Sequence, residues 1–277
     1  MRCRRVVWKI TVALLCLAVA CQRASPGTVD IATTTSVQNS GLLNHLLPAF
    51  EQASGITVRV HAVGSGLALK MLADGGVDAV ISHAPEAEAR LLSQHPDWSY
   101  RKIAHNRFVV AGPPDDPAHI GGAATVVQAF QRIADSGVSF VSRGDESGTH
   151  ERERMFWSAA GRRPRDAHLL VSGSGMAQAL RHANETRGYV LTDAPTFWQL
   201  VPRLDLRILF EHDDRLVNAY AVTNRPSRSA AAALAAWLVS ADGRAAIGAF
   251  LIEGRRAYEP WPSDCPGEQP AATPCLK

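Results

Sequence analysis

Apolar residues along this chain recur at two spacings, one typical of strands and the other of helices. Residues 56–63 alternate apolar and polar positions, whereas residues 41–53 place leucines three and four positions apart after Ser40, a residue suited to cap a helix. The elements predicted in this half are strands over 29–32, 56–63 and 77–82 and helices over 41–53 and 67–73. Alternation of strands and helices predicts a parallel sheet with helices packed against it.

The same alternation resumes around the proline-rich break PPDDP at residues 113–117. The strands predicted here cover residues 108–112, 139–142, 168–171, 188–191, 206–210 and 216–223, and the helices cover residues 125–134, 150–160 and 176–184. Two final helices, over residues 229–240 and 244–250, have no strand of their own. We expect them to pack back onto the first half of the chain.

These patterns together predict an α/β protein of two lobes with a ligand cleft between them. The first lobe would combine residues 28–107 with residues 224–260, and the second would cover residues 108–223. Chain crossings near residues 108–112 and within 192–223 would form a hinge. Residues 261–277 form a proline-rich tail.

Four loops share one design, in which a strand gives way to glycine and hydroxyl residues and then to a helix. Their sequences are TTTS from residue 33, GSG from residue 64, RGDESGT from residue 143 and SGSG from residue 172. Loops after parallel strands gather at the edge of the sheet where ligands bind, and helix N-termini attract anions. The pattern therefore predicts an oxyanion site. Its candidate residues are Thr34, Thr35, Ser36, Ser65, Gly66, Arg143, Ser147, Gly148, Thr149 and Ser174.

Arg143 supplies the fixed positive charge among these four loops. Its planar guanidinium offers five donors, which suits an anion with several oxygens, and Gly148 would let a ligand approach the backbone. A structural alternative stands beside this hypothesis: Ser147 and Thr149 would only cap the next helix, and Arg143 would pair with Asp145 or Glu146. Taken singly, each of the other three loops is more typical of a turn.

The first twenty residues predict an export signal. Basic residues precede a short apolar run that ends before Cys21, and both a lipoprotein cleavage box and an A-x-A site fit there. Removing residues 1–20 leaves Cys21, Cys265 and Cys275. If Cys265 and Cys275 form a disulfide in the oxidising compartment, a lipid anchor would explain the remaining Cys21, which could otherwise be a free thiol. We expect a protein of the periplasm or cell surface.

Composition and charge narrow the class of protein further. With 46% hydrophobic and 20% charged residues, the chain is typical of a soluble globular protein. Loss of four of the 29 basic residues with the signal leaves 25 against 26 acidic residues, so the formal charge falls from +3 to −1. A nucleic-acid partner is not indicated. Anion recognition must therefore come from local geometry.

Seven motifs resemble one known family in order and spacing. They are TTTS, LLPAF, AVGSGLALKM, VDAVISHAP, FVVAGP, FVSRGDESGTH and SGSGM, spread over about residues 28–225. This series resembles the tungstate-binding substrate-binding proteins of ABC importers. The resemblance implies a type II periplasmic-binding-protein fold, a monomer, an ABC permease as membrane partner, and tungstate or molybdate as ligand without a further cofactor.

The resemblance also implies which residues hold the oxyanion. They are Thr34, Thr35 or Ser36 from the first loop, Ser65 from the second, and Arg143 and Thr149 from the third. Two positions depart from the family pattern: Ser65 stands where threonine is usual, and Ala194 stands where an arginine is expected after LTD.

Two alternative functions start from the same residues. Phosphate binders also carry an Arg-x-Asp-x-Ser-Gly-Thr run. Phosphate keeps a proton, and an Asp145 side chain pointing inward could accept a hydrogen bond from it. Tungstate and molybdate are unprotonated dianions, which a buried carboxylate would repel. An Asp145 turned toward Arg143 would favour the dianion. A hydrolase using Ser147 and His150 lacks the glycine that a G-x-S-x-G elbow requires at position 145. We expect no enzyme activity and no protein-bound metal site, and interpret His83 as a loop or core histidine.

Overall fold

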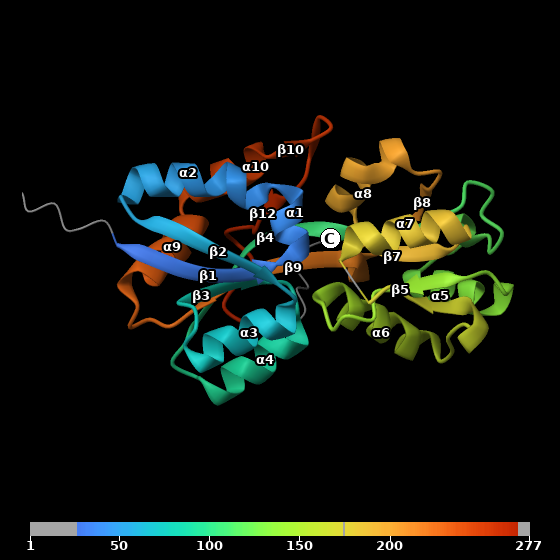
Figure 1. Ribbon diagram of the computed structural model, residues 1–277, viewed down its shortest axis with the longest axis horizontal. Coiled ribbons are helices and arrows are strands. Elements are labelled where there is room, and N and C mark those ends of the chain that lie inside the picture. The colour runs from blue at the N-terminus through green and yellow to red at the C-terminus, as the bar shows by residue number, and fades with distance from the viewer. Residues whose placement is uncertain (1–26, 174, 271–277) are drawn as a thin grey trace, which may run out of the picture.

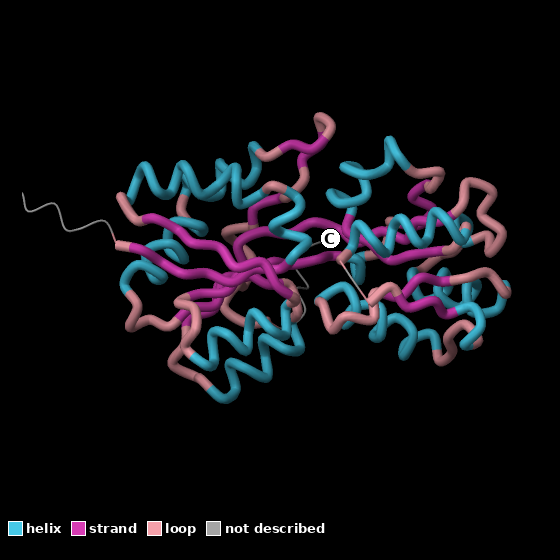
Figure 2. The backbone as a smooth tube through the Cα atoms, in the orientation of Figure 1, coloured by secondary structure: helices cyan, strands magenta, loops and turns pink. Residues whose placement is uncertain are grey.

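One continuous mixed sheet forms the centre of the protein. The computed structural model describes residues 27–173 and 175–270. The main path of the sheet runs in the order β2-β1-β3-β9-β4-β7-β5-β6, and β8 and β12 pair with β4 beside it. The strands run through the middle of the molecule, with helices around them (Figure 2). The strands are β1 (Thr28–Thr34), β2 (Thr57–Val63), β3 (Ala79–Ser82), β4 (Ser99–Gly112), β5 (Phe140–Ser142), β6 (Leu169–Val171), β7 (Tyr189–Asp193), β8 (Arg207–Phe210), β9 (Val217–Asn224) and β12 (Glu259–Pro260).

Helices cover both faces of this sheet in each of two parts that lie side by side (Figure 1). In the first part, α2 and α9 pack against one face and α3 and α4 against the other. In the second part, α5 and α6 cover one face, and α7 and α8 cover the other. The helices are α1 (Thr35–Ser40), α2 (Leu42–Ser54), α3 (Ser65–Asp74), α4 (Pro85–Gln94), α5 (Val126–Ser136), α6 (Gly148–Ala160), α7 (Met176–Thr186), α8 (Ala194–Leu200), α9 (Ser229–Val239) and α10 (Ala241–Ala249).

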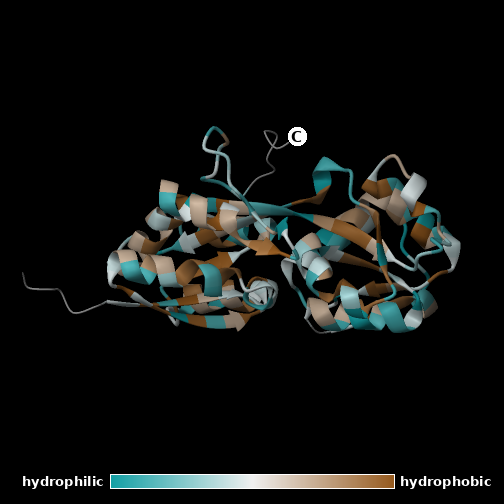
Figure 3. Ribbon diagram, turned by 90° about the horizontal axis from the view of Figure 1, so that it is seen from above, coloured by the Kyte–Doolittle hydropathy of each residue, from teal (hydrophilic) through white to brown (hydrophobic). Residues whose placement is uncertain are grey.

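The alternation of residues along the strands explains why both faces are apolar. In β7, Tyr189 and Leu191 belong to the core under α5 and α6, while Val190 between them belongs to the core under α7 and α8. Successive strand residues point to opposite faces, so a strand buried on both sides needs an unbroken apolar run. Hydrophobic residues accordingly follow the strands through the interior, with hydrophilic ones on the outer helix faces (Figure 3).

Two antiparallel strands join the parts. β4 is 14 residues long; residues from Ser99 to Arg107 pair with β9, residues from Phe108 to Ala111 pair with β7, and residues from Val110 to Gly112 pair with β8. The strand predicted over 108–112 is therefore only the end of a longer one. β9 pairs with β3 and with the first stretch of β4, and its Tyr220 and Val222 lie in the first core. Residues 217–223, assigned to the second lobe from the sequence, thus pack with the first part.

Several helix boundaries differ from the sequence prediction for local reasons. Ser40 ends α1 instead of capping the next helix, because Gly41 adopts φ 82° and turns the chain before α2 begins. α4 and α8 were missed. Both start with a proline in their first turn, a position where proline is tolerated, and α8 has only seven residues, which is too few to show a clear periodicity.

The C-terminal segment packs against the first part as expected, but the prediction that it has no strand is wrong. β12 pairs with β4, and β10 (Leu251–Ile252) pairs with β11 (Arg255–Arg256). The segment continues past Trp261, which is 4% exposed, and the Gly267 carbonyl accepts the Lys102 backbone N–H at 2.8 Å. Cys265 is disulfide-bonded. The predicted signal at residues 1–20, Cys21, Ser174 and Cys275 lie outside the described residues.

In the described part of the chain, no single helix is both long and apolar enough to cross a membrane; α9 and α10 meet these criteria only as a pair bent by 64°.

Candidate functional site

The predicted loops meet where the two parts face each other. A Cβ atom placed on Gly64 would lie 3.9 Å from the Asp145 carbonyl, and one on Gly175 would lie 3.9 Å from Thr35 Oγ1. A Cβ on Gly148 would lie 2.3 Å from the His83 carbonyl oxygen. Loops from residues 33, 64, 143 and 172 therefore converge on one region, as their positions after strands predicted. The structure also brings the end of β3, with His83, into the same region.

In the first loop, three of the four hydroxyls bond within the protein. Thr33 donates to the Ile81 carbonyl at 3.1 Å. Thr34 caps α1 by accepting the Val37 N–H at 3.3 Å, and its Oγ1 lies 3.0 Å from Ser36 Oγ. Thr35 is half-buried and faces Gly175 of the opposite part. The loop thus presents one hydroxyl across the interface.

Arg143 is buried at the end of β5, with its side chain 2% exposed. Its Nη2 pairs with the Asp145 carboxylate, its Nη1 lies 3.4 Å from Met176 Sδ, and its backbone N–H donates to Glu153 Oε2 at 3.1 Å. Asp145 Oδ1 also accepts the Ser147 N–H at 3.2 Å. The Asp145 carboxylate therefore turns toward Arg143 and its own loop.

At the start of α6, Ser147 and Thr149 have different roles. Ser147 is the N-cap and accepts the His150 N–H at 3.3 Å, so the structural alternative holds for this residue and for the pairing of Arg143 with Asp145. Thr149 lies inside the first turn instead of capping it, and its side chain is 1% exposed.

Three buried hydroxyls have no hydrogen-bond partner among the described residues, and one of them, on Thr223, lies within β9. The other two stand at helix starts in the candidate loops, one from each part: Ser65 Oγ at the start of α3 and Thr149 Oγ1 in the first turn of α6. Buried hydroxyls almost always find a partner, because leaving one unpaired costs about 1–3 kcal/mol. Both stand at the positive ends of helices of 10 and 13 residues. A negatively charged acceptor would satisfy both.

Burial shifts the pKa of two ionisable groups beside these loops. It lowers the pKa of His83 to about 4, helped by the charges of Arg143 and Arg152. It raises the pKa of Glu153 to about 7, against the bonds that this carboxylate accepts. At neutral pH His83 is therefore uncharged.

Gly66 and His150 have different surroundings from the buried loop residues. A Cβ on Gly66 would meet no atom within 4 Å, so the described surroundings do not require glycine there. His150 Nδ1 accepts the Glu146 N–H at 3.1 Å, which ties the imidazole to the loop backbone instead of to the Ser147 hydroxyl. Within residues 27–173 and 175–270, no group of three His, Cys, Asp or Glu side chains is arranged to hold a metal ion.

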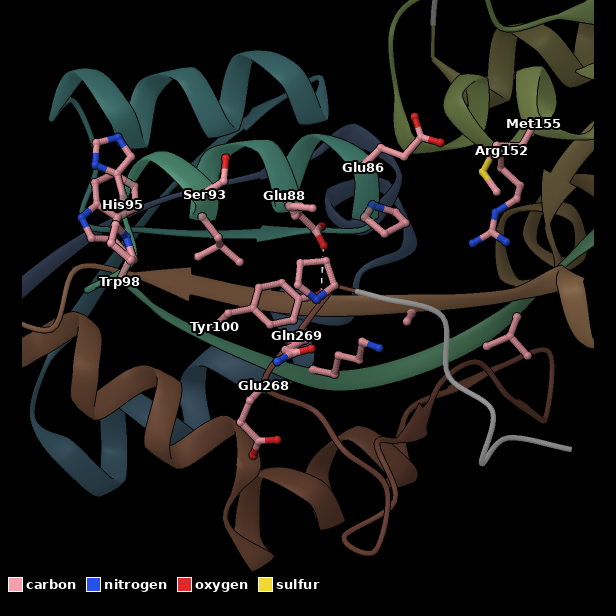
Figure 4. Close-up of a pocket in the computed structure, with 18 of the residues that line it drawn as sticks. Glu86, Glu88, Ser93, His95, Trp98, Tyr100, Arg152, Met155, Glu268 and Gln269 are labelled. Atoms are coloured by element: carbon pink, nitrogen blue, oxygen red, sulfur yellow. Dashed lines mark hydrogen bonds between the residues drawn. The ribbon is translucent and has the colours of Figure 1, made fainter.

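A separate pocket of about 1160 Å³ lies beside the strands that join the parts (Figure 4). Trp98 and Tyr100 line it from the first part, and Arg152 and Met155 line it from the second. Of the sequence-predicted site residues that the structure describes, none lines it. It touches the site through Glu88, which lines the pocket and accepts bonds from Ser82 Oγ and the Ala84 N–H on either side of His83.

Comparison with known proteins places this arrangement in a family. A profile of the PBP superfamily domain matches residues 22–242. The tungstate-binding protein TupA of Peptoclostridium acidaminophilum is 33% identical over 241 residues, covering 84% of this chain and 83% of the relative. This chain belongs to the tungstate-binding protein family of the PBP superfamily.

Solved structures of this family share the fold. The tungstate-binding protein TupA of Desulfovibrio alaskensis G20 is 33% identical, with a TM-score of 0.73 over 84% of this chain and 98% of that one. The tungstate ABC transporter protein of Geobacter sulfurreducens is 35% identical, with a TM-score of 0.73 over 80% and 98%. The family resemblance and the α/β, type II periplasmic-binding-protein fold are confirmed.

Sequence reasoning did not predict the contacts of His83 with the first and third loops. The interpretation of His83 as a loop or core histidine is confirmed, since it follows β3 and is 3% exposed, but its contacts with Ser36 and Gly148 were not expected. A usable signal existed: His83 follows β3 directly, at the same sheet edge as the loops after β1 and β2. Asn218, its partner on β9, gave no signal, because it sits 135 positions away in an ordinary strand.

Proposed function

We propose that this protein is the substrate-binding component of an ABC importer and captures a tetrahedral metal oxyanion, tungstate or molybdate, for a membrane permease. The observation that supports this most strongly is that the buried hydroxyls of Ser65 and Thr149 have no hydrogen-bond partner in the part of the chain that the structure describes. They come from opposite parts, so an anion accepting both hydrogens would hold the parts together. The names of its relatives point to the same ligand.

The donor set favours an unprotonated dianion over phosphate. A monoprotonated phosphate would need an acceptor for its proton. Glu146 in the candidate loop is exposed, and the loop's other carboxylate is that of Asp145. Because that carboxylate already bonds Arg143 and the Ser147 N–H, it is committed to the protein. Neutral donors and two helix starts remain for the ligand, and the positive charge of Arg143 lies beside them, which suits a dianion without a proton to donate.

The proposed mechanism is closure of two lobes. The first lobe holds β1 to β3 and the second holds β5 to β7, with β4 and β9 as the connection. Ligand binding between them would expel water, which strengthens each charge-assisted hydrogen bond. We further propose export by residues 1–20 to the periplasm or cell surface, anchoring through Cys21, a Cys265–Cys275 disulfide, and function as a monomer.

Isothermal titration calorimetry of residues 21–277 with tungstate, molybdate, sulfate and phosphate tests the proposal. We expect tungstate and molybdate to bind far more tightly than phosphate. Thr149→Val should weaken tungstate binding about 10- to 150-fold, because a hydrogen bond to a charged group contributes about 1.5–3 kcal/mol. Thr57→Val, on an exposed strand residue, is the matched control. Tight phosphate binding without a tungstate signal would replace this function with phosphate capture.

A further inference from the structure

A chain of buried hydrogen bonds runs from the first loop to the strands that join the two parts. Thr34 Oγ1 lies 3.0 Å from Ser36 Oγ, and Ser36 Oγ lies 3.3 Å from His83 Nε2. His83 Nδ1 in turn lies 3.0 Å from Asn218 Oδ1. All four side chains are at most 7% exposed. Because each hydroxyl has a single hydrogen, the direction of donation along this chain decides which hydroxyls remain available to a ligand.

The Asn218 amide sets that direction. Its Nδ2 lies 2.9 Å from Asn106 Oδ1 and 2.8 Å from the Tyr220 hydroxyl, so both amide hydrogens have acceptors. The amide oxygen consequently faces His83 Nδ1, and an amide oxygen can only accept. The hydrogen of the neutral imidazole therefore resides on Nδ1, which leaves a lone pair on Nε2.

His83 Nε2 therefore accepts a hydrogen bond from the Ser36 hydroxyl. The Ser36 oxygen then accepts the Thr34 hydrogen, and the Thr34 oxygen already accepts the Val37 N–H. Both hydroxyl hydrogens are thus used inside the protein. Ser65 and Thr149 differ, because their hydroxyls have no partner within the described part of the chain. Thr35 Oγ1 faces the opposite part at Gly175.

We propose that His83 is a positioning residue that commits the Thr34 and Ser36 hydroxyls to the protein, so that Thr35, Ser65 and Thr149 donate to the oxyanion. This inference rests on the proposed function and decides among the hydroxyls of the first loop.

The surroundings of His83 keep its ring in place and uncharged. Glu88 Oε1 accepts the Ser82 hydroxyl at 2.7 Å and the Ala84 N–H at 2.9 Å, which fixes the chain on both sides of the histidine. The ring stacks on Tyr220 of β9 with centroids 4.9 Å apart.

The charged groups around the ring mostly oppose a second proton. Arg143 from the third loop and Arg152 from α6 disfavour protonation, and Asp145 favours it. Desolvation is the largest influence and also disfavours the imidazolium. His83 is therefore neutral, with one ring hydrogen, which it donates from Nδ1 to Asn218, so that Nε2 can accept from Ser36.

Two measurements on the mature protein test the proposal. The first is the ¹⁵N NMR spectrum of the His83 ring at neutral pH, with and without tungstate, assigned by comparison with His83→Gln. We expect the Nδ1–H tautomer in both states. An Nε2–H tautomer would mean that the Asn218 and Asn106 amides are turned around and that Ser36 accepts from His83, which would overturn the proposal.

The second measurement compares tungstate affinity and melting temperature among hydroxyl variants. Ser36→Ala should keep the wild-type dissociation constant within about threefold while lowering the melting temperature, because it leaves His83 Nε2 without its donor. Ser65→Ala and Thr149→Val should raise the dissociation constant about 10- to 150-fold. A Ser36→Ala loss as large as that of Thr149→Val would refute the assignment.

The controls separate this proposal from the proposed function. A wild-type protein that binds none of the four oxyanions overturns both. A wild-type protein that binds tungstate while Ser36→Ala loses affinity overturns only the role of His83. A purely structural role for His83 would be revealed by a His83→Gln variant whose affinity loss is the same with and without Ser36→Ala, because independent sites add.

Discussion

Replacing Gly148 with alanine tests whether the two parts close against each other at the site. Gly148 begins α6, and an added Cβ would lie 2.3 Å from the His83 carbonyl oxygen and 2.9 Å from its carbonyl carbon. Real Cβ contacts are rarely closer than 3.4 Å, so the two segments must separate by about 1 Å. The contacted atoms are backbone and cannot rotate away.

The expected cost follows from the size of this overlap. Overpacking by one methyl group costs about 1–3 kcal/mol, which corresponds to an increase of about 5- to 140-fold in the tungstate dissociation constant at 1.4 kcal/mol per factor of ten. Alanine itself is favoured over glycine inside a helix, so the local backbone adds no penalty. Under the proposed closure of the two lobes, the clash arises when the parts touch, and opening would relieve it. The melting temperature of the ligand-free protein should therefore stay near that of the wild type.

Calorimetry and thermal unfolding of Gly148→Ala measure these two quantities. Gly248→Ala on α10 is the matched control, because its added Cβ would lie no closer than 3.6 Å to Pro260 side-chain atoms. It should bind tungstate as the wild type does. If Gly148→Ala keeps the wild-type dissociation constant within twofold, the contact between Gly148 and His83 does not limit binding. A lower melting temperature without an affinity change would place the contact in the ligand-free state instead.

Three further predictions follow from single side chains. Arg143→Ala should weaken tungstate binding about 10- to 150-fold in calorimetry. Arg143→Lys should keep only part of the wild-type affinity, because an ammonium lacks the planar fork of a guanidinium. Unchanged affinity in both variants would make the residue structural. Burial raises the pKa of Glu153 from 4.5 to about 7, so its contribution to stability is present below pH 4.5 and is lost as the pH rises through 7. In urea unfolding, Glu153→Gln should therefore be more stable than the wild type at pH 8 and differ little from it at pH 4.5. An equal gain in stability at both pH values would contradict this. Ser147→Ala removes the N-cap of α6 and should lower the melting temperature by about 2–4 °C, since such caps contribute about 1 kcal/mol; no change would show that water replaces the cap.

The sequence determined most of the elements because their signals are local. Period-two runs marked β2, leucines at helical spacing marked α2, and glycine with hydroxyl residues marked the loops after β1, β2 and β5. Each of these signals lies within about ten residues, where backbone geometry alone relates residue spacing to shape. The ordered series of motifs was also enough to predict the family and fold.

Boundaries that depend on distant partners could not be predicted this way. β9 was assigned to the second lobe because its sequence follows that lobe, but its pairing with β3 and β4 puts it in the first. The full length of β4 was missed for the same reason, since its first stretch is stabilised by β9 more than 100 positions later.

The candidate loops were predicted from the sequence, but which of their hydroxyls bond within the protein and which can donate to a ligand depends on the tertiary structure. TTTS contains equivalent-looking side chains, and nothing within the motif says which hydrogens are free. Ser36 finds its acceptor 47 positions away on His83, and His83 finds its own 135 positions away on Asn218. A hydroxyl can donate only one hydrogen, so the partner that folding brings beside it determines whether a ligand can use it.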